Sequence, residues 1–182
     1  MKRALLLSAC LGWAIATIGC QRQPSLEAEV KRILNKIEER TTRFNVSNYK
    51  PELPEPGPAT PDFEKALELS RGVKELRVEV TQKGAGPKVE PGLMINLAYV
   101  GRLMDGYVFE STYTQGGDFL YFRYEPGQVI EGLYKGLAGI RVGEKRVITI
   151  PSKLAYGEKG APPKVPPNMA LRFEVYCLWV GK

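Results

Sequence analysis

From Arg71 to the end of the chain, apolar and polar residues alternate in several short segments. When the pattern repeats every two residues, every second side chain lies on the same face of an extended chain, and this predicts half-buried β-strands. The clearest of these segments are 95–99, 120–124, 147–150 and 171–177. Between the first two, an Asp105-Gly106 pair precedes a further apolar segment, and this is a strong signal for a hairpin turn. The pattern therefore predicts a set of antiparallel strands.

One glycine-rich helix is predicted to interrupt these strands, over Ile130–Leu137. Leu133 and Leu137 share one face of this helix, whereas Gly132 and Gly136 line another. Because glycine has a poor helix propensity, tertiary packing must compensate, most simply by a close approach of the helix to the sheet. Several antiparallel strands around one short helix make an α+β domain.

In the last predicted strand, the alternation places Cys177 on the side that faces the core, and it places Trp179 on the same side. A free cysteine in such a position behaves as a small apolar residue. We therefore expect Cys177 to be a core residue, and a reactive thiol is the alternative.

The chain has 182 residues, a net charge of +6, three cysteines and no histidine. The missing histidine excludes Ser-His-Asp and Cys-His catalytic sites and zinc sites that contain histidine. Three cysteines cannot supply a Cys-only zinc site with four ligands. Function must therefore come from carboxylates, Tyr, Lys, Arg or an apolar pocket. Because the positive charge is not concentrated in one block, a nucleic-acid partner is not expected.

The N-terminus has the pattern of an export signal. A basic start at Lys2-Arg3 precedes an uncharged run from Ala4 to Gly19, which is shorter than the roughly 20 apolar residues of a membrane span. The residues before Cys20 resemble a bacterial lipobox, and this resemblance implies a signal peptide over 1–19 and a lipid on the Cys20 thiol. In a Gram-negative host, Gln21 further implies the periplasmic face of the outer membrane. An uncleaved anchor or an ordinary signal peptide is the alternative.

A lipid-anchored arm is predicted to follow, over residues 20–70, before a domain over 71–182. Within the arm, residues 25–44 read as a helix with one apolar stripe near the coiled-coil period. This helix could form a homodimer, or lie on the surface of the domain or membrane, or fray. Five prolines between 51 and 61 predict an extended, semi-rigid spacer. Residues 62–69 then predict a short helix with Asp62 as its cap. The apolar stripe of the first helix is formed by Leu26, Val30, Ile33 and Ile37.

Six short motifs follow one another in the β-rich part of the chain. They are Tyr99-Val100-Gly101, Asp105-Gly106, Phe109-Glu110-Ser111, 127–132 (Gly-Gln-Val-Ile-Glu-Gly), Ala155-Tyr156-Gly157 and 165–168 (Val-Pro-Pro-Asn). In this order and spacing they closely resemble the FKBP family of peptidyl-prolyl cis-trans isomerases, over roughly Gly72 to Val180. The family fold is an antiparallel β-sheet curled around one short α-helix, which agrees with the periodicity.

The resemblance implies an apolar pocket between sheet and helix that receives a proline ring. Its substrate-binding positions correspond to Tyr99, Phe109, Leu120, Val129, Ile130, Leu133, Tyr156, Val165 and Phe173. The chain departs from the family pattern at several of these and nearby positions. Leu133 replaces the usual Trp, Leu120 a usual Phe, and Glu110 the usual Asp. Ala161 and Lys164 stand where apolar or aromatic residues are common, so we expect a wider, less aromatic pocket.

Rotation about an X-Pro bond breaks no covalent bond, but it must overcome a barrier of about 18–20 kcal/mol. The mechanism that the resemblance implies needs no metal or cofactor. By resemblance, the Tyr156 hydroxyl donates a hydrogen bond to the substrate, while Glu110 orients polar groups such as the Tyr99 hydroxyl. These three residues are the expected catalytic groups. The expected partners are proline-containing, unfolded or partly folded polypeptides, and the membrane through Cys20. The alternative function is a chaperone or docking module of the same fold with little turnover.

Overall fold

The computed structural model describes Lys31 and residues 55–113 and 119–182. The predicted signal peptide, Cys20, nearly all of the helix over 25–44 and the first prolines of the spacer lie outside these residues. Among the described residues, no helix is both long enough and apolar enough to cross a membrane.

The described chain forms one antiparallel sheet with two short α-helices. The order of the strands in the sheet is β1-β5-β6-β2-β3, and β4 pairs with β2 as well. The elements are α2 (Phe63–Arg71), β1 (Arg77–Gln82), β2 (Met94–Leu103), β3 (Val108–Ser111), β4 (Leu120–Arg123), α3 (Glu131–Gly136), β5 (Lys145–Ile150), a 3-10 turn (Ser152–Leu154) and β6 (Leu171–Gly181).

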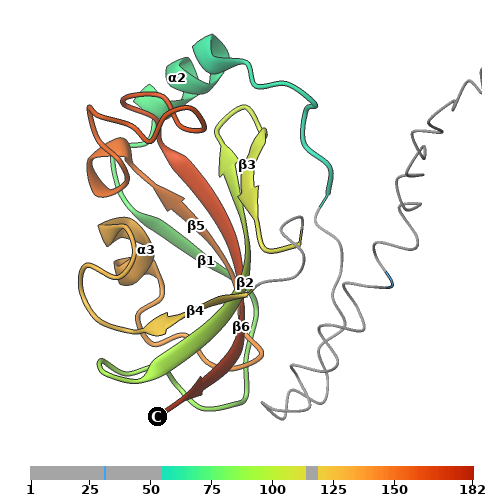
Figure 1. The fold of residues 1–182 in the computed structure, drawn as a ribbon, viewed down its shortest axis with the longest axis vertical. Coiled ribbons are helices and arrows are strands. Elements are labelled where there is room, and N and C mark those ends of the chain that lie inside the picture. Colours follow the sequence, from blue (N-terminus) through green and yellow to red (C-terminus); the bar gives the residue numbers. More distant parts are fainter. Residues whose placement is uncertain (1–30, 32–54, 114–118) are drawn as a thin grey trace, which may run out of the picture.

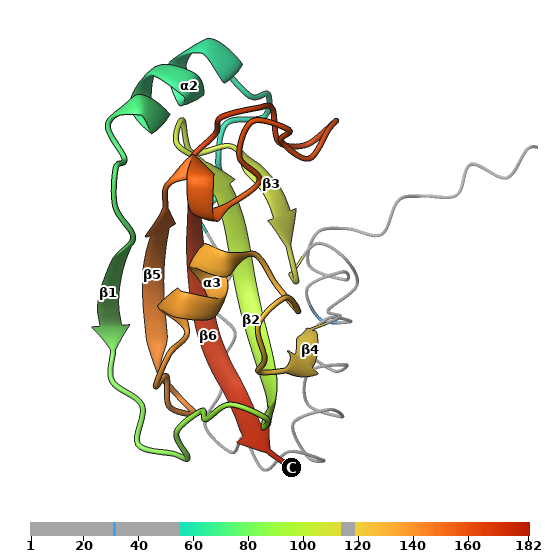
Figure 2. The ribbon, with the colours of Figure 1, turned by 90° about the vertical axis from the view of Figure 1, so that its left-hand side faces the viewer.

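The sheet curls around α3, which lies against one of its faces (Figures 1 and 2). We call this the front face, and it carries the main apolar core, including Leu97, Ile148 and Phe173. Residues 55–62 run along the other side of the sheet, which we call the back face (Figure 1). An antiparallel sheet around one short helix confirms the fold class predicted from the periodicity.

Close packing between α3 and β5 fixes the height of the helix above the sheet. A Cβ atom at Gly132 would overlap the Ile150 side chain, and one at Gly136 would overlap Ile148. The two glycines therefore sit where no larger residue fits without a shift. This confirms the prediction that the glycine face lets the helix approach the sheet.

Polar contacts hold the C-terminal end of α3 in the same position. The Arg146 guanidinium on β5 donates to the Gly136 carbonyl at 2.8 Å and to the Ala138 carbonyl at 3.0 Å. It also pairs with Glu144 at 2.6 Å, and both side chains of this pair are nearly buried. Since the carbonyls at a helix end have no partner within the helix, Arg146 satisfies them and locks α3 to the sheet.

The final strand contains a bulge that the alternation did not reveal. Leu97 pairs with Cys177, but Asn96 pairs with Trp179, so Leu178 is the extra residue. Cys177 is fully buried in the core, as predicted. The prediction for Trp179 was wrong, because the bulge turns its side chain to the back face, where its ring lies 6.1 Å from that of Tyr121.

The helix α2 packs on the domain rather than standing apart in the arm. Asp62 caps it, as predicted, by accepting from the Lys65 amide at 3.0 Å. Ala66 is fully buried in the main core, and the Ser70 hydroxyl accepts from the Ala170 amide at 3.0 Å. The packed unit therefore extends N-terminally beyond Arg71, where the change in periodicity placed the domain boundary.

Replacing Gly136 by alanine tests the close packing of α3. We expect Gly136→Ala to destabilise the fold by about 1–3 kcal/mol, because the new methyl group must displace Ile148, and to lower the melting temperature by several degrees. Thermal unfolding followed by circular dichroism measures this, with the exposed neighbour Lys135→Ala as control. A melting temperature equal to or above wild type would contradict the account, since alanine improves helix propensity by about 1 kcal/mol.

Candidate functional site

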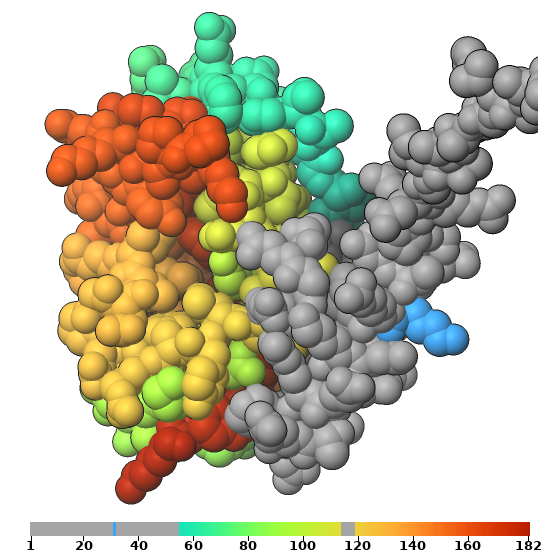
Figure 3. Space-filling view, viewed as in Figure 1, coloured from blue at the N-terminus to red at the C-terminus, as the bar shows by residue number. Residues whose placement is uncertain are grey.

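The predicted pocket residues come together on the front face, between α3, the sheet and the loop after β5. Figure 3 shows a hollow where these segments meet, with β6 at its floor. Phe109, Leu133, Val165 and Phe173 are buried and form the floor of this site. Five half-buried residues pack against that core and form its rim, namely Tyr99, Leu120, Val129, Ile130 and Tyr156.

Three aromatic rings from three strands give the floor its shape. The rings of Phe109 on β3 and Phe173 on β6 meet edge to face, with centroids 5.8 Å apart. The Tyr99 ring on β2 lies 5.8 Å from Phe173 in a tilted arrangement. The Phe109 ring also lies directly over Gly101, where a Cβ atom would stand 2.7 Å from the ring. Gly101 therefore leaves the space that the tip of the Phe109 ring occupies against β2.

The helix supplies the opposite wall of the pocket. Ile130 is the N-cap of α3, in an extended conformation, and Leu133 follows one turn later. At the other side of the helix, the Tyr124 hydroxyl donates to the Tyr134 carbonyl at 2.9 Å and the two rings stack 4.7 Å apart. The helix is thus held from the residue that follows β4 as well as from β5, which fixes Ile130 and Leu133 relative to the aromatic floor.

Two hydroxyls and one carboxylate meet at the polar side of the pocket. The Tyr99 hydroxyl hydrogen-bonds with the Glu110 carboxylate, and both groups are close enough to the Tyr156 hydroxyl to interact with it electrostatically. The residues expected to be catalytic therefore lie together. They come from β2, β3 and the loop after β5, which shows that the sheet and the loop must both be in place.

Burial raises the pKa of the Tyr99 hydroxyl above its ordinary value near 10, and the charge of Glu110 and its hydrogen bond raise it further. Burial also raises the pKa of Tyr156, with a second contribution from the charge of Glu110. Both hydroxyls therefore keep their protons at neutral pH. Glu110 already accepts from Tyr99, so Tyr156 is the hydroxyl better placed to donate to a ligand in the pocket.

Lys164 is part of this polar side, a role that sequence reasoning missed. Its ammonium lies 3.7 Å from the Glu110 carboxylate, although both side chains remain partly exposed. The sequence identified Lys164 only as a departure from an apolar pattern. The loop that carries it returns over the pocket through a bridge between Ala161 and Val165, and no local signal predicts that return.

The site can bind an apolar ring and present a neutral hydrogen-bond donor beside it. Its floor is hydrocarbon and aromatic, and its one carboxylate is engaged by Tyr99 and Lys164. Within residues 55–113 and 119–182, no group of three or more Cys, Asp or Glu side chains is placed to hold a metal ion.

The chain matches known proteins over this same region. Residues 86–178 match the model of the family described as FKBP-type peptidyl-prolyl cis-trans isomerase. Over 95 residues the chain is 46% identical to peptidyl-prolyl cis-trans isomerase FKBP2 of Mus musculus, covering 52% of this chain and 67% of that protein. It is 45% identical over 89 residues to peptidyl-prolyl cis-trans isomerase FPR2 of Saccharomyces cerevisiae, covering 48% of this chain and 65% of that protein.

Two solved structures share the fold. The crystal structure of AtFKBP13 aligns with a TM-score of 0.53 and 35% identity, covering 57% of this chain and 90% of that one. A peptidyl-prolyl cis-trans isomerase from Pseudomonas syringae pv. tomato aligns with a TM-score of 0.55 and 29% identity, covering 69% of this chain and all of that one.

The raised tyrosine pKa values predict how the protein responds to pH. The folded chain holds these two protons more tightly than the unfolded chain, whose tyrosines titrate near pH 10. The stability from this source is therefore complete below about pH 10 and is lost as the pH rises above that value. We expect activity in the pocket to stay level between about pH 6 and 9, because the Tyr99 and Tyr156 hydroxyls keep their protons over that range. A pH–rate profile with a midpoint near neutrality would contradict the assignment.

Proposed function

This chain belongs to the FKBP-type peptidyl-prolyl cis-trans isomerase family, and we propose that its front-face pocket catalyses the isomerisation by binding X-Pro and stabilising the twisted imide. One observation supports this assignment more than any other. The buried floor of Phe109, Leu133 and Phe173 lies directly beside the Tyr99–Glu110–Tyr156 group. The site thus combines an apolar pocket that can hold a proline ring with a neutral hydrogen-bond donor at its edge.

The physical task of the pocket is to favour a twisted amide over a planar one. Uncatalysed exchange takes tens to hundreds of seconds, and a thousandfold acceleration needs roughly 4 kcal/mol. Transferring the imide carbonyl from water to an apolar site weakens the resonance that keeps the amide planar, because water favours the polar planar form. Binding that is stronger in the twisted state than in the planar state therefore accelerates the rotation.

We infer that Tyr156 contributes the hydrogen bond that distinguishes the two states. Its hydroxyl would donate to the imide carbonyl once that oxygen has rotated out of the planar arrangement. Glu110 would act through Tyr99, whose hydroxyl it holds, so the carboxylate positions the aromatic wall and transfers no proton. Leu133 and Leu120, in place of larger rings, would leave room for bulky residues beside the proline.

Two substitutions test the apolar floor of the pocket and the hydrogen-bond donor separately. We expect Phe109→Ala to lower kcat/KM by at least tenfold, because it removes a buried aromatic wall. Tyr156→Phe should lower kcat by about three- to tenfold, the worth of one neutral hydrogen bond, with little change in KM. A protease-free isomerisation assay with an X-Pro-Phe peptide at low temperature measures both, using the protein without residues 1–20. The substitution Tyr121→Phe, on the opposite face, is the matched control.

Unchanged rates in both variants would contradict the pocket assignment. A folded wild-type protein with no turnover but with measurable binding of the peptide would instead favour the chaperone or docking function, with the Leu133 and Leu120 replacements as the physical cause.

We further propose that the protein works in the bacterial cell envelope, attached through a lipid on Cys20. The support is the N-terminal sequence alone: a basic start, an uncharged run from Ala4 to Gly19, and a small residue before the cysteine. Its clients would be proline-containing polypeptides that fold outside the cytoplasm.

Replacing Cys20 tests the anchor. In a bacterial host, wild-type protein should sediment with the membrane fraction and incorporate a radiolabelled fatty acid, whereas Cys20→Ser should carry no label and leave the membrane pellet or keep its signal peptide. The substitution Cys10→Ser should change neither result. Label on the Cys20→Ser protein, or none on wild type, would rule out the proposed lipid.

A further inference from the structure

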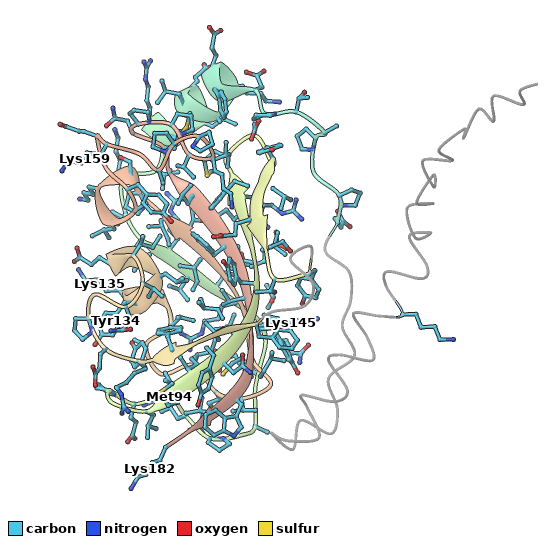
Figure 4. The ribbon with its side chains drawn as sticks, viewed as in Figure 1. Met94, Tyr134, Lys135, Lys145, Lys159 and Lys182 are labelled. Atoms are coloured by element: carbon cyan, nitrogen blue, oxygen red, sulfur yellow. The ribbon has the colours of Figure 1, made fainter. Side chains whose placement is uncertain are left out.

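We infer that the back face of the sheet is a docking groove for the N-terminal arm of the same chain, so that residues 25–44 pack on the side opposite the pocket. The back face contains a cavity of about 600 Å³. Its floor crosses four strands, with Ala98 and Val100 on β2, Tyr176 on β6, Val147 on β5 and Thr81 on β1. Figure 4 labels Lys145, which also lines it, on the side of the sheet away from Tyr134 and Lys135 of α3.

The chain enters the domain within this groove. Glu55, Pro56, Gly57 and Pro58 form one of its walls. Arg102, a nearly buried residue of β2, donates to the Glu55 carbonyl and to the Gly106 carbonyl, and it pairs with Glu174 at 3.2 Å. Its guanidinium therefore ties the end of the spacer to the sheet. The residues that precede Glu55 must start from the groove.

The entry segment is fitted closely to the hairpin as well. A Cβ atom at Gly57 would overlap the Gly106 carbonyl oxygen, and the Asp62 amide donates to Asp105 at 2.7 Å. The segment therefore lies against the domain from Glu55 onward. This fixed start shortens the path that the arm must span to reach the groove.

The groove has an apolar floor bordered by charged side chains such as Lys145 and Arg172, and the arm can offer an apolar side to that floor. Leu26, Val30, Ile33 and Ile37 recur at helical spacing in the sequence and would form one apolar stripe, and an isolated helix of this length is marginal in water without a surface to cover that stripe. Lys31, the single described residue of the segment 25–44, has a helical backbone and an exposed side chain. At 100° per residue it lies on the side away from the stripe, as a docked helix would place it.

The covalent connection favours this occupant over a second copy of the protein. The 18 Cα-to-Cα steps from Ile37 to Glu55 can span about 60 Å when fully extended, so the arm reaches the groove. A short tether gives the arm an effective concentration in the millimolar range, well above that of a free partner. Because the groove and the pocket lie on opposite faces, a docked arm leaves the pocket open and directs it away from the anchor.

Photo-crosslinking in the protein without residues 1–20 tests the inference. A photoreactive amino acid placed at Val147, in the groove, should crosslink to peptides from residues 25–44. The same group at Val78, which is exposed on the front face, should not. An equal mixture of ¹⁴N- and ¹⁵N-labelled protein separates crosslinks within one chain from those between chains. Thr81 provides a second position in the groove if the Val147 substitution impairs folding.

Matched charge substitutions in the arm complete the test. Ile33→Lys with Ile37→Lys should reduce the crosslink at least about tenfold, because two buried isoleucines are lost. Ala28→Lys with Asn35→Lys adds the same charge to the opposite side of the helix and should keep it. Both double variants should keep isomerase activity, so failure of the docking and failure of the proposed function are distinguishable. Crosslinks only between chains, equal crosslinks at Val78, or none from the groove to the arm would overturn the inference.

Discussion

The contact between α3 and β5 determines most of what this fold can do. Gly132 and Gly136 let the helix lie directly on Ile150 and Ile148, and Arg146 fastens its C-terminal end. With the helix at that height, Ile130 and Leu133 of its N-terminal turn pack in the same core as Phe109 and Phe173 and line the pocket with them. A larger residue on the glycine face would lift the helix and open the pocket. The poor helix propensity of the sequence is therefore the consequence of a packing requirement.

The sheet uses its two faces for different purposes. The front face holds the core, the aromatic floor and the hydroxyl donors, and its tyrosines remain protonated because burial and Glu110 raise their pKa values. The back face holds Arg102 and the entry of the chain. A reaction that only rotates a bond needs no titrating base, which explains how a chain without histidine can be an enzyme of this kind. Separate faces also allow the chain to be tethered without covering its active pocket.

Sequence periodicity predicted the parts of the structure that depend on local pattern. The antiparallel strands, the Asp105-Gly106 turn, the glycine face of the helix and the burial of Cys177 all follow from side-chain spacing. Three features did not follow, because each depends on contacts between distant segments. The bulge at Leu178 turns the Trp179 side chain to the other face of the sheet. The loop after β5 brings Lys164 close to Glu110. The Arg102 guanidinium donates a hydrogen bond to the Glu55 carbonyl. The grouping of pocket residues was predicted only through the family resemblance.

Exchange NMR of an X-Pro peptide mixed with ¹⁵N-labelled protein lacking residues 1–20 is the measurement that tests the central claim most directly. It reports catalysed cis-trans exchange of the peptide and the place where the peptide binds in one sample. The account predicts exchange peaks between the cis and trans peptide at substoichiometric protein, with peptide-induced shifts confined to the front-face pocket around Phe109, Ile130 and Tyr156. Uncatalysed exchange, or shifts confined to the back face, would contradict it.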